Sequence, residues 1–176
     1  MINVEFGIVK EWLEAMLDTA SDIEFLEEHL RRLTNRMEQV SSPKLTDMPR
    51  NPSPQRDRMS EDIARKDTLQ ERIADKMAFL EASRVLLERL LECCCNRKER
   101  KVIQLHDIAG MDWSEIAPLI FDAEKLTGEE GTKCIDALYR YRRRGAQKIA
   151  KFLHEKDGDD GFPTLADIAE RRIKNF

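Results

Sequence analysis

The sequence of 176 residues has few aromatic side chains, few glycines and prolines, and no long apolar run. No stretch approaches the ~18 consecutive apolar residues that a membrane helix requires, so we expect no transmembrane segment and no membrane partner. The first residues lack a basic region followed by an apolar stretch, which predicts a cytoplasmic protein without a secretory signal. A hydrophobic fraction of 41% is too high for general disorder.

The sequence has cysteines, but their spacing is not that of a disulfide framework or a metal site. The four cysteines are Cys93, Cys94, Cys95 and Cys134, three of them consecutive. A disulfide framework needs separated pairs, and a tetrahedral zinc site favours spacings such as CxxC. We therefore expect reduced thiols packed as small apolar residues, with no metal and no cofactor. Metal or redox use of these cysteines is the alternative.

Catalytic motifs are absent as well. The sequence contains no glycine-rich phosphate loop, no HExxH and no nucleophile elbow. His29 and His154 are expected to face solvent, and His106 lies near a predicted helix end, where a cation is favourable. We therefore predict structural roles for the three histidines and a protein that is not an enzyme.

The placement of glycine and proline predicts two long helices. No glycine occurs between Gly7 and Gly110, and the prolines of that span all lie between Pro43 and Pro54. Glycine and proline are the main interrupters of helices. The prediction is an all-α fold that begins with a long antiparallel helical hairpin over 1–95, with a Pro-rich loop at 41–58.

Apolar spacing supports this hairpin. In the first arm the two stripes are Val9, Leu13, Met16, Ala20 and Ile23, then Ile23, Leu26, Leu30, Leu33, Met37 and Val40. They differ in phase near Ser21, so either one helix stammers there or two helices meet at a capping box of Ser21 and Glu24. The second-arm stripe is Ile63, Ile73, Met77, Leu80, Leu87, Leu91 and Cys94.

A hairpin this thin buries only one stripe per helix. A third helix, the next domain or a second copy of the chain would have to cover it. A homodimer through the helical hairpin is therefore one expected arrangement.

Residues 96–154 differ in character from the two arms. The apolar face of Val102, Ile103, Leu105 and Ile108 precedes Gly110, which is expected to end that helix. Asp112 or Ser114 is expected to cap a short helix over 115–121. Trp113 is expected to pack between these two helices.

A strongly basic helix is predicted next. Between Lys133 and Lys151 the sequence has seven cations and one carboxylate, Asp136, a net charge of +6 in a chain of net charge −4. Arginine suits contacts to phosphate and to guanine edges. The predicted DNA-binding residues are Arg140, Arg143, Arg144, Gln147, Lys148 and Lys151. A merely solvated basic face is the alternative.

The order of these helices is that of a helix-turn-helix reader, whose last helix enters the DNA major groove. A major groove about 12 Å wide admits one α-helix, and the phosphates on its rims attract cations. The segments 99–105, 108–117 and 141–149 carry this pattern, including Ile108-Ala109-Gly110 and Trp113-Ser114-Glu115-Ile116-Ala117.

These segments resemble region 4 of sigma-70-type factors. They are more similar to phage and prophage proteins of Gram-positive bacteria, some of them autolysin-regulator-like late-gene regulators. Those proteins place such a domain behind a helical hairpin whose loop often contains a segment like Thr46-Asp47-Met48-Pro49-Arg50, as here. An insertion of about ten residues from Asp122 to about Lys133 departs from the family pattern. It either lengthens the basic helix or enlarges the turn.

The remaining segment, 155–176, is predicted to be an acidic linker followed by a short helix capped at Thr164 and ending at Ile173. The resemblance implies a DNA-binding transcriptional regulator whose partners are double-stranded DNA and RNA polymerase. The alternative function is a helical interaction or scaffold protein that binds RNA polymerase or another phage component.

Overall fold

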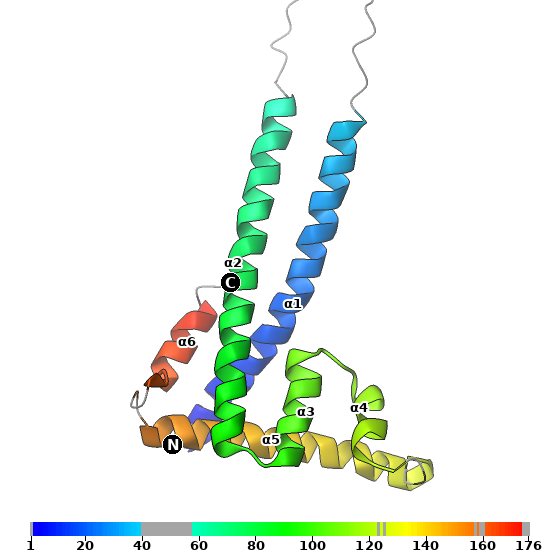
Figure 1. Ribbon diagram of the computed structural model, residues 1–176, viewed down its shortest axis with the longest axis vertical. Coiled ribbons are helices and arrows are strands. Elements are labelled where there is room, and N and C mark those ends of the chain that lie inside the picture. The colour runs from blue at the N-terminus through cyan, green and yellow to red at the C-terminus, as the bar shows by residue number, and fades with distance from the viewer. Residues whose placement is uncertain are drawn as a thin grey trace, which may run out of the picture. The chain divides into compact units, whose positions relative to one another are not determined.

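The computed structural model describes residues 2–39, 58–122, 124, 126–156, 158 and 161–173. The helices are α1 (Ile2–Glu38), α2 (Arg58–Cys94), α3 (Arg97–Ile103), the π-helical turn η1 (Gln104–Ile108), α4 (Trp113–Ile120), α5 (Gly128–Lys156) and α6 (Leu165–Ile173) (Figure 1). The described residues contain no strand, which confirms the all-α class. Within these ranges, none of the helices combines the length and the apolarity that a membrane span requires.

The chain forms two compact units, which differ from the predicted domains 1–95, 96–154 and 155–176. Unit 1 contains Met1–Ala20 and Phe79–Phe176, and unit 2 contains Ser21–Ala78. The start of α1 and the end of α2 thus belong with the C-terminal helices, and Trp12 Nε1 lies 3.4 Å from Ser83 Oγ inside unit 1. The predicted loop at 41–58, with the segment 46–50, lies outside the described residues except for Arg58, where α2 begins.

Helix α1 is continuous, so neither the capping box at Ser21 nor a stammer occurs. The buried stripe passes through Trp12 and Thr19, which are 1% and 5% exposed, and these two positions restore an unbroken three-four repeat from Val9 to Met37. The Thr19 hydroxyl donates a hydrogen bond to the Ala15 carbonyl (2.6 Å). This bond satisfies a polar group inside an apolar stripe, which is why a pattern of apolar residues alone missed the position.

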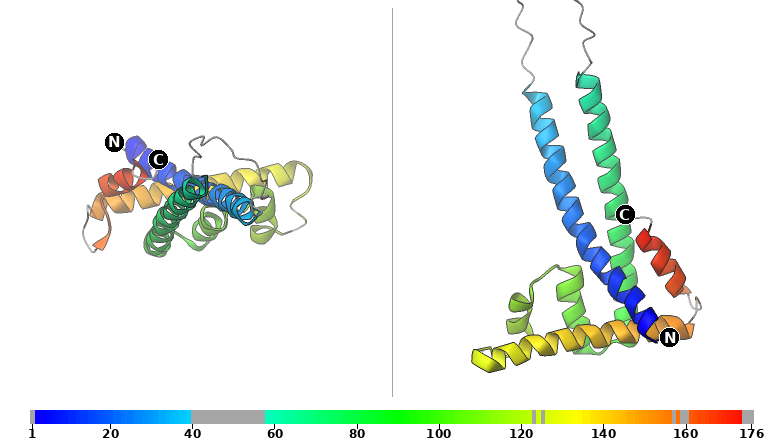
Figure 2. Two further views of the ribbon diagram at one scale, coloured as in Figure 1. Left: turned by 90° about the horizontal axis from the view of Figure 1, so that it is seen from above. Right: turned by 180° about the vertical axis from the view of Figure 1, so that it is seen from behind.

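The predicted stripe of α2 is partly wrong, because Ile63 and Met77 are exposed. The buried stripe instead contains Leu69, Ile73, Leu80, Leu87 and Leu90, with polar residues before and between them. In unit 2, α1 and α2 lie side by side (Figure 2). Two of these polar residues pair with residues of α1. Asp62 contacts Arg36 at 2.9 Å and Lys76 contacts Asp22 at 2.8 Å.

The C-terminal helices of unit 1 pack around a second apolar cluster. Its fully or nearly buried members are Val102, Ile116, Ala117 and Leu138, so α3, α4 and α5 all contribute. Gly110 follows η1 with φ of +67°, which confirms that it ends this segment. Of the two proposed caps, Asp112 precedes α4, and its backbone N–H donates to Glu115 Oε2 at 3.0 Å. The predicted cap of α6 is confirmed, because Thr164 and Asp167 exchange hydrogen bonds.

Gly145 allows α5 to approach α3 closely. A Cβ atom at this position would lie 2.5 Å from Cδ1 of Ile103, which is fully buried. We expect Gly145→Ala to lower the free energy of unfolding by about 1–3 kcal/mol, because the core must shift to admit the methyl group. Urea denaturation followed by circular dichroism measures this change.

Gly7→Ala is the matched control. Gly7 is also helical, and its Cβ would meet nothing within 4 Å. Replacing it should stabilise the protein by about 0.5–1 kcal/mol through helix propensity alone. Equal stabilisation by both substitutions would show that α5 does not approach α3 this closely.

Candidate nucleic-acid interface

Helix α5 has one buried face and one exposed face. The buried residues are Cys134, Leu138, Gly145, Ala146, Ile149, Ala150 and Leu153. Arg140, Arg144, Gln147 and Lys151 recur at steps of four, three and four on the opposite face, where the three cations are exposed and Gln147 is half-buried. A row of outward cations therefore runs along the middle of α5.

The exposed arginines of α5 have no carboxylate partner among the described residues. Arg140 donates to the Asp136 carbonyl of its own helix, at 3.3 Å. The Arg143 guanidinium lies 5.9 Å from the ring centre of Phe6. Across the described ranges, Arg144 has neither a hydrogen bond nor an ion pair. These three charges are therefore available to an anionic partner.

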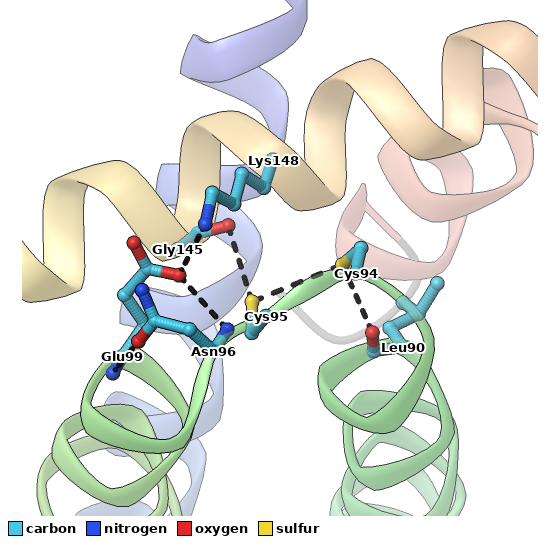
Figure 3. A network of polar contacts seen from close by, with 7 residues as sticks. All are labelled: Leu90, Cys94, Cys95, Asn96, Glu99, Gly145 and Lys148. Carbon is cyan, nitrogen blue, oxygen red and sulfur yellow. Dashed lines mark hydrogen bonds and ion pairs between the residues drawn. The ribbon is translucent and has the colours of Figure 1, made fainter.

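Lys148 is neutralised by a carboxylate of α3, which lies outside its own helix. Lys148 Nζ lies 2.7 Å from Oε2 of Glu99, whose side chain is 3% exposed (Figure 3). The same oxygen accepts the backbone N–H of Asn96 at 3.1 Å, which completes the cap of α3. Lys148 is thus the counter-ion of a buried carboxylate. Lys151 has only a weak, exposed pair with Glu155 at 3.6 Å.

Arg142 was not among the predicted site residues, although it makes a bidentate contact with a buried carboxylate. Its Nη2 and Nε donate to both oxygens of Asp107 at 2.6–3.0 Å. The Asp107 side chain is fully buried and that of Arg142 is 16% exposed. Arg142 follows Leu138 by four residues and precedes Gly145 by three, so helical periodicity already places it on the buried face.

An aromatic stack joins η1, α4 and α5 near this ion pair. The Trp113 ring lies 3.9 Å from the His106 ring and 4.5 Å from the Tyr139 ring, centre to centre. Trp113 was expected between α3 and α4, and it contacts α5 as well. His106 Nδ1 lies 3.1 Å from the Met111 carbonyl oxygen, so this histidine also supports the turn after η1.

The segment from Asp122 to Lys133 is divided between a turn and the first residues of α5. α4 ends at Ile120 and α5 begins at Gly128 with Glu129 and Glu130 in its first turn. Arg140 therefore lies about three turns after the start of α5. The cations occupy the middle of a 29-residue helix and its N-terminal end is acidic.

Comparisons with known proteins do not identify a relative. A scan of protein-family models, a search of curated proteins and a search of solved structures each find no match to this chain. In the parts that the structure describes, no group of three or more His, Cys, Asp and Glu side chains is arranged to hold a metal ion.

Removal of one partner of the Arg142–Asp107 pair is expected to destabilise unit 1 strongly. Arg142→Met would leave the Asp107 carboxylate buried without its counter-ion, at a cost of about 3–5 kcal/mol in the free energy of unfolding. Lys151→Met removes an exposed pair of the same helix and should cost less than about 1 kcal/mol. Chemical denaturation of both variants measures the difference.

The double variant Arg142→Met/Asp107→Leu separates charge from packing. Removing both partners should recover part of the lost stability, because no unpaired charge then stays buried. Equal stability of the Arg142→Met and Lys151→Met variants would contradict the bidentate contact.

Proposed function

We propose that this protein is a DNA-binding transcriptional regulator that contacts double-stranded DNA through the exposed face of α5. The observation that supports the proposal most is the separation of cations on this helix. Arg142 and Lys148 are neutralised by Asp107 and Glu99, whereas Arg140 and Arg144 are exposed and have no carboxylate partner among the described residues. A rod with one cationic face fits a groove lined by phosphates.

In this proposal each outward residue has a distinct role. Arg140, Arg143 and Arg144 contact phosphates or guanine edges, and Lys151 contacts phosphate. Gln147, which is half-buried on the same face, contacts a base. Lys148, whose side chain is 44% exposed, lies beside this face and holds α5 to Glu99.

We further propose that the chain is a regulator of the phage and prophage type, with a sigma-70 region-4-like helix-turn-helix behind an antiparallel helical hairpin. In this assignment α1 and α2 form the hairpin, α4 is the supporting helix and α5 the reading helix. The packing of Val102, Ile116 and Leu138 in one cluster supports the grouping of α3, α4 and α5. Trp113, Ile116 and Ala117 belong to the motif that resembles this family.

The acidic start of α5 changes how such a domain would dock. Helix-turn-helix proteins place the N-terminal residues of the second helix against base edges. Here Glu129 and Glu130 occupy the first turn, where phosphates would repel them. We propose that the segment from Arg140 to Lys151 in the middle of α5 lies against the duplex.

Substitution of the exposed arginines tests this proposal. The double variant Arg140→Ala/Arg144→Ala should bind duplex DNA at least about fivefold more weakly. A plot of log affinity against log salt concentration should become shallower by about 0.9 for each phosphate that the variant no longer neutralises. Fluorescence anisotropy of a labelled duplex with a genomic promoter sequence, titrated at several salt concentrations, measures both quantities.

Arg32→Ala is the matched control for this experiment. Arg32 is also a highly exposed helical arginine, but it lies in unit 2 and pairs with Glu28 at 2.7 Å. Its removal should leave the DNA affinity and the salt slope unchanged. A double variant of Arg140 and Arg144 that binds like Arg32→Ala would overturn the assignment of α5.

An exposed apolar strip on α2 favours a second candidate function, self-association. Met59, Ile63 and Met77 are 49%, 45% and 52% exposed and recur at helical spacing on one side of α2 in unit 2. In a two-fold antiparallel pairing of α2 helices, Met59 of one copy can face Met77 of the other, as an isologous interface requires. We propose that this strip joins two copies of the chain.

Sedimentation equilibrium tests the homodimer. Ile63→Glu and Met77→Glu should each shift the protein towards the monomer, because a carboxylate on a helix–helix interface is costly to bury. Phe25→Glu replaces an apolar residue of α1 that is 71% exposed and should leave the dimer intact. A monomeric wild-type chain would contradict the homodimer and favour another protein, such as RNA polymerase, as the occupant.

A further inference from the structure

Three consecutive cysteines lie where α2 ends and the chain turns into α3. Cys93 is exposed, Cys94 is half-buried and Cys95 is buried. Helix α2 ends at Cys94, and only Cys95 and Asn96 separate it from the start of α3 at Arg97. The thiols therefore sit at a junction that α5 also contacts, next to Gly145.

The side chains of Cys94 and Cys95 face each other. Their sulfur atoms are 3.8 Å apart (Figure 3). The Cys94 thiol donates to the Leu90 carbonyl oxygen at 2.9 Å, and the Cys95 thiol contacts the Gly145 carbonyl oxygen at 3.7 Å. These contacts hold two adjacent thiols as a pair, whereas Cys93 lies outside this network.

Direct oxidation of this pair to a disulfide is sterically unfavourable. Neighbouring Cα atoms are about 3.8 Å apart across a trans peptide, which is shorter than the separation of about 4.4–6.8 Å found in disulfides. A larger atom bridging the two sulfurs avoids this problem, because the sulfurs need not reach bonding distance of each other. The Cys95 thiol and burial both raise the pKa of Cys94, so the thiol is protonated at neutral pH.

We propose that Cys94 and Cys95 form a two-thiol binding site for a trivalent organoarsenical. In the reaction, R–As=O and two thiols give R–As(S–Cys)2 and one water molecule. Two As–S bonds form, the As=O bond breaks, and its oxygen leaves with the two thiol protons. No atom changes oxidation state, so no oxidant or reductant is needed. Soft sulfur ligands suit this soft element.

Binding of an arsenical would change the contact between Cys95 and α5. Bonding to arsenic removes the thiol proton that points to the Gly145 carbonyl, and Gly145 lies between Arg144 and Ala146 on the helix assigned to DNA binding. The Glu99–Lys148 pair, which also joins α5 to α3, lies close by (Figure 3). Bound arsenical is therefore expected to weaken DNA binding, a consequence that rests on the proposed function.

Phenylarsine oxide and the full-length chain test the site directly. Intact-mass spectrometry in the presence of a competing monothiol should show one phenylarsenic group per wild-type chain. Cys94→Ser and Cys95→Ser should each weaken binding by about 10²-fold or more, because the second bond forms at high effective concentration only when both thiols are present. Cys93→Ser and Cys134→Ser should bind like the wild type. Circular dichroism checks that each variant is folded.

The outcomes separate this proposal from the proposed function. An adduct that survives Cys95→Ser, or that disappears in Cys93→Ser, would overturn the Cys94–Cys95 site whether or not the chain binds DNA. An adduct that forms as expected but leaves DNA affinity unchanged would overturn the link to α5. Failure of the unmodified chain to bind DNA would contradict the proposed function, and the mass measurement would still decide the thiol site.

Discussion

The ion pair between Arg142 and Asp107 fixes how α5 is held in unit 1. It joins a fully buried carboxylate of η1 to a guanidinium on the inward face of α5, a helix whose other arginines are exposed. A buried carboxylate requires such a partner, and a bidentate contact also fixes the rotation of the helix about its axis. With Arg142 turned inward, Arg140 and Arg144 must turn outward.

The second contact of this kind, between Lys148 and Glu99, acts two turns further along α5 and joins it to the capped start of α3. Gly145 lies between the two pairs and lets the helices approach. The inward side of α5 therefore combines neutralised charge with close packing. The outward side of α5 retains exposed positive charge. This separation of neutralised and exposed cations supports the proposed binding of DNA.

The sequence predicted the helical class, the end of the helix at Gly110 and the capped last helix, because glycine and capping residues act locally. The predicted stripes of α1 and α2 omitted Thr19, Asp62 and Lys76, because a pattern of apolar residues passes over polar ones. The polar groups of these residues are satisfied by a carbonyl one turn earlier or by a charged residue on the other helix. The sequence also missed the partners of Arg142 and Lys148. Ion pairs between residues 35 and 49 positions apart leave no local pattern.

In the proposed function, DNA contacts the outward arginines of α5 and leaves the inward arginine, Arg142, untouched. The most direct measurement is a titration of the full chain with a short duplex while the arginine side-chain Nε–Hε resonances are followed by NMR. If DNA binds this face, the signals of Arg140 and Arg144 shift, whereas those of Arg142 and Arg32 stay in place. Shifts confined to arginines outside α5, or no shifts at all, would contradict the proposed function.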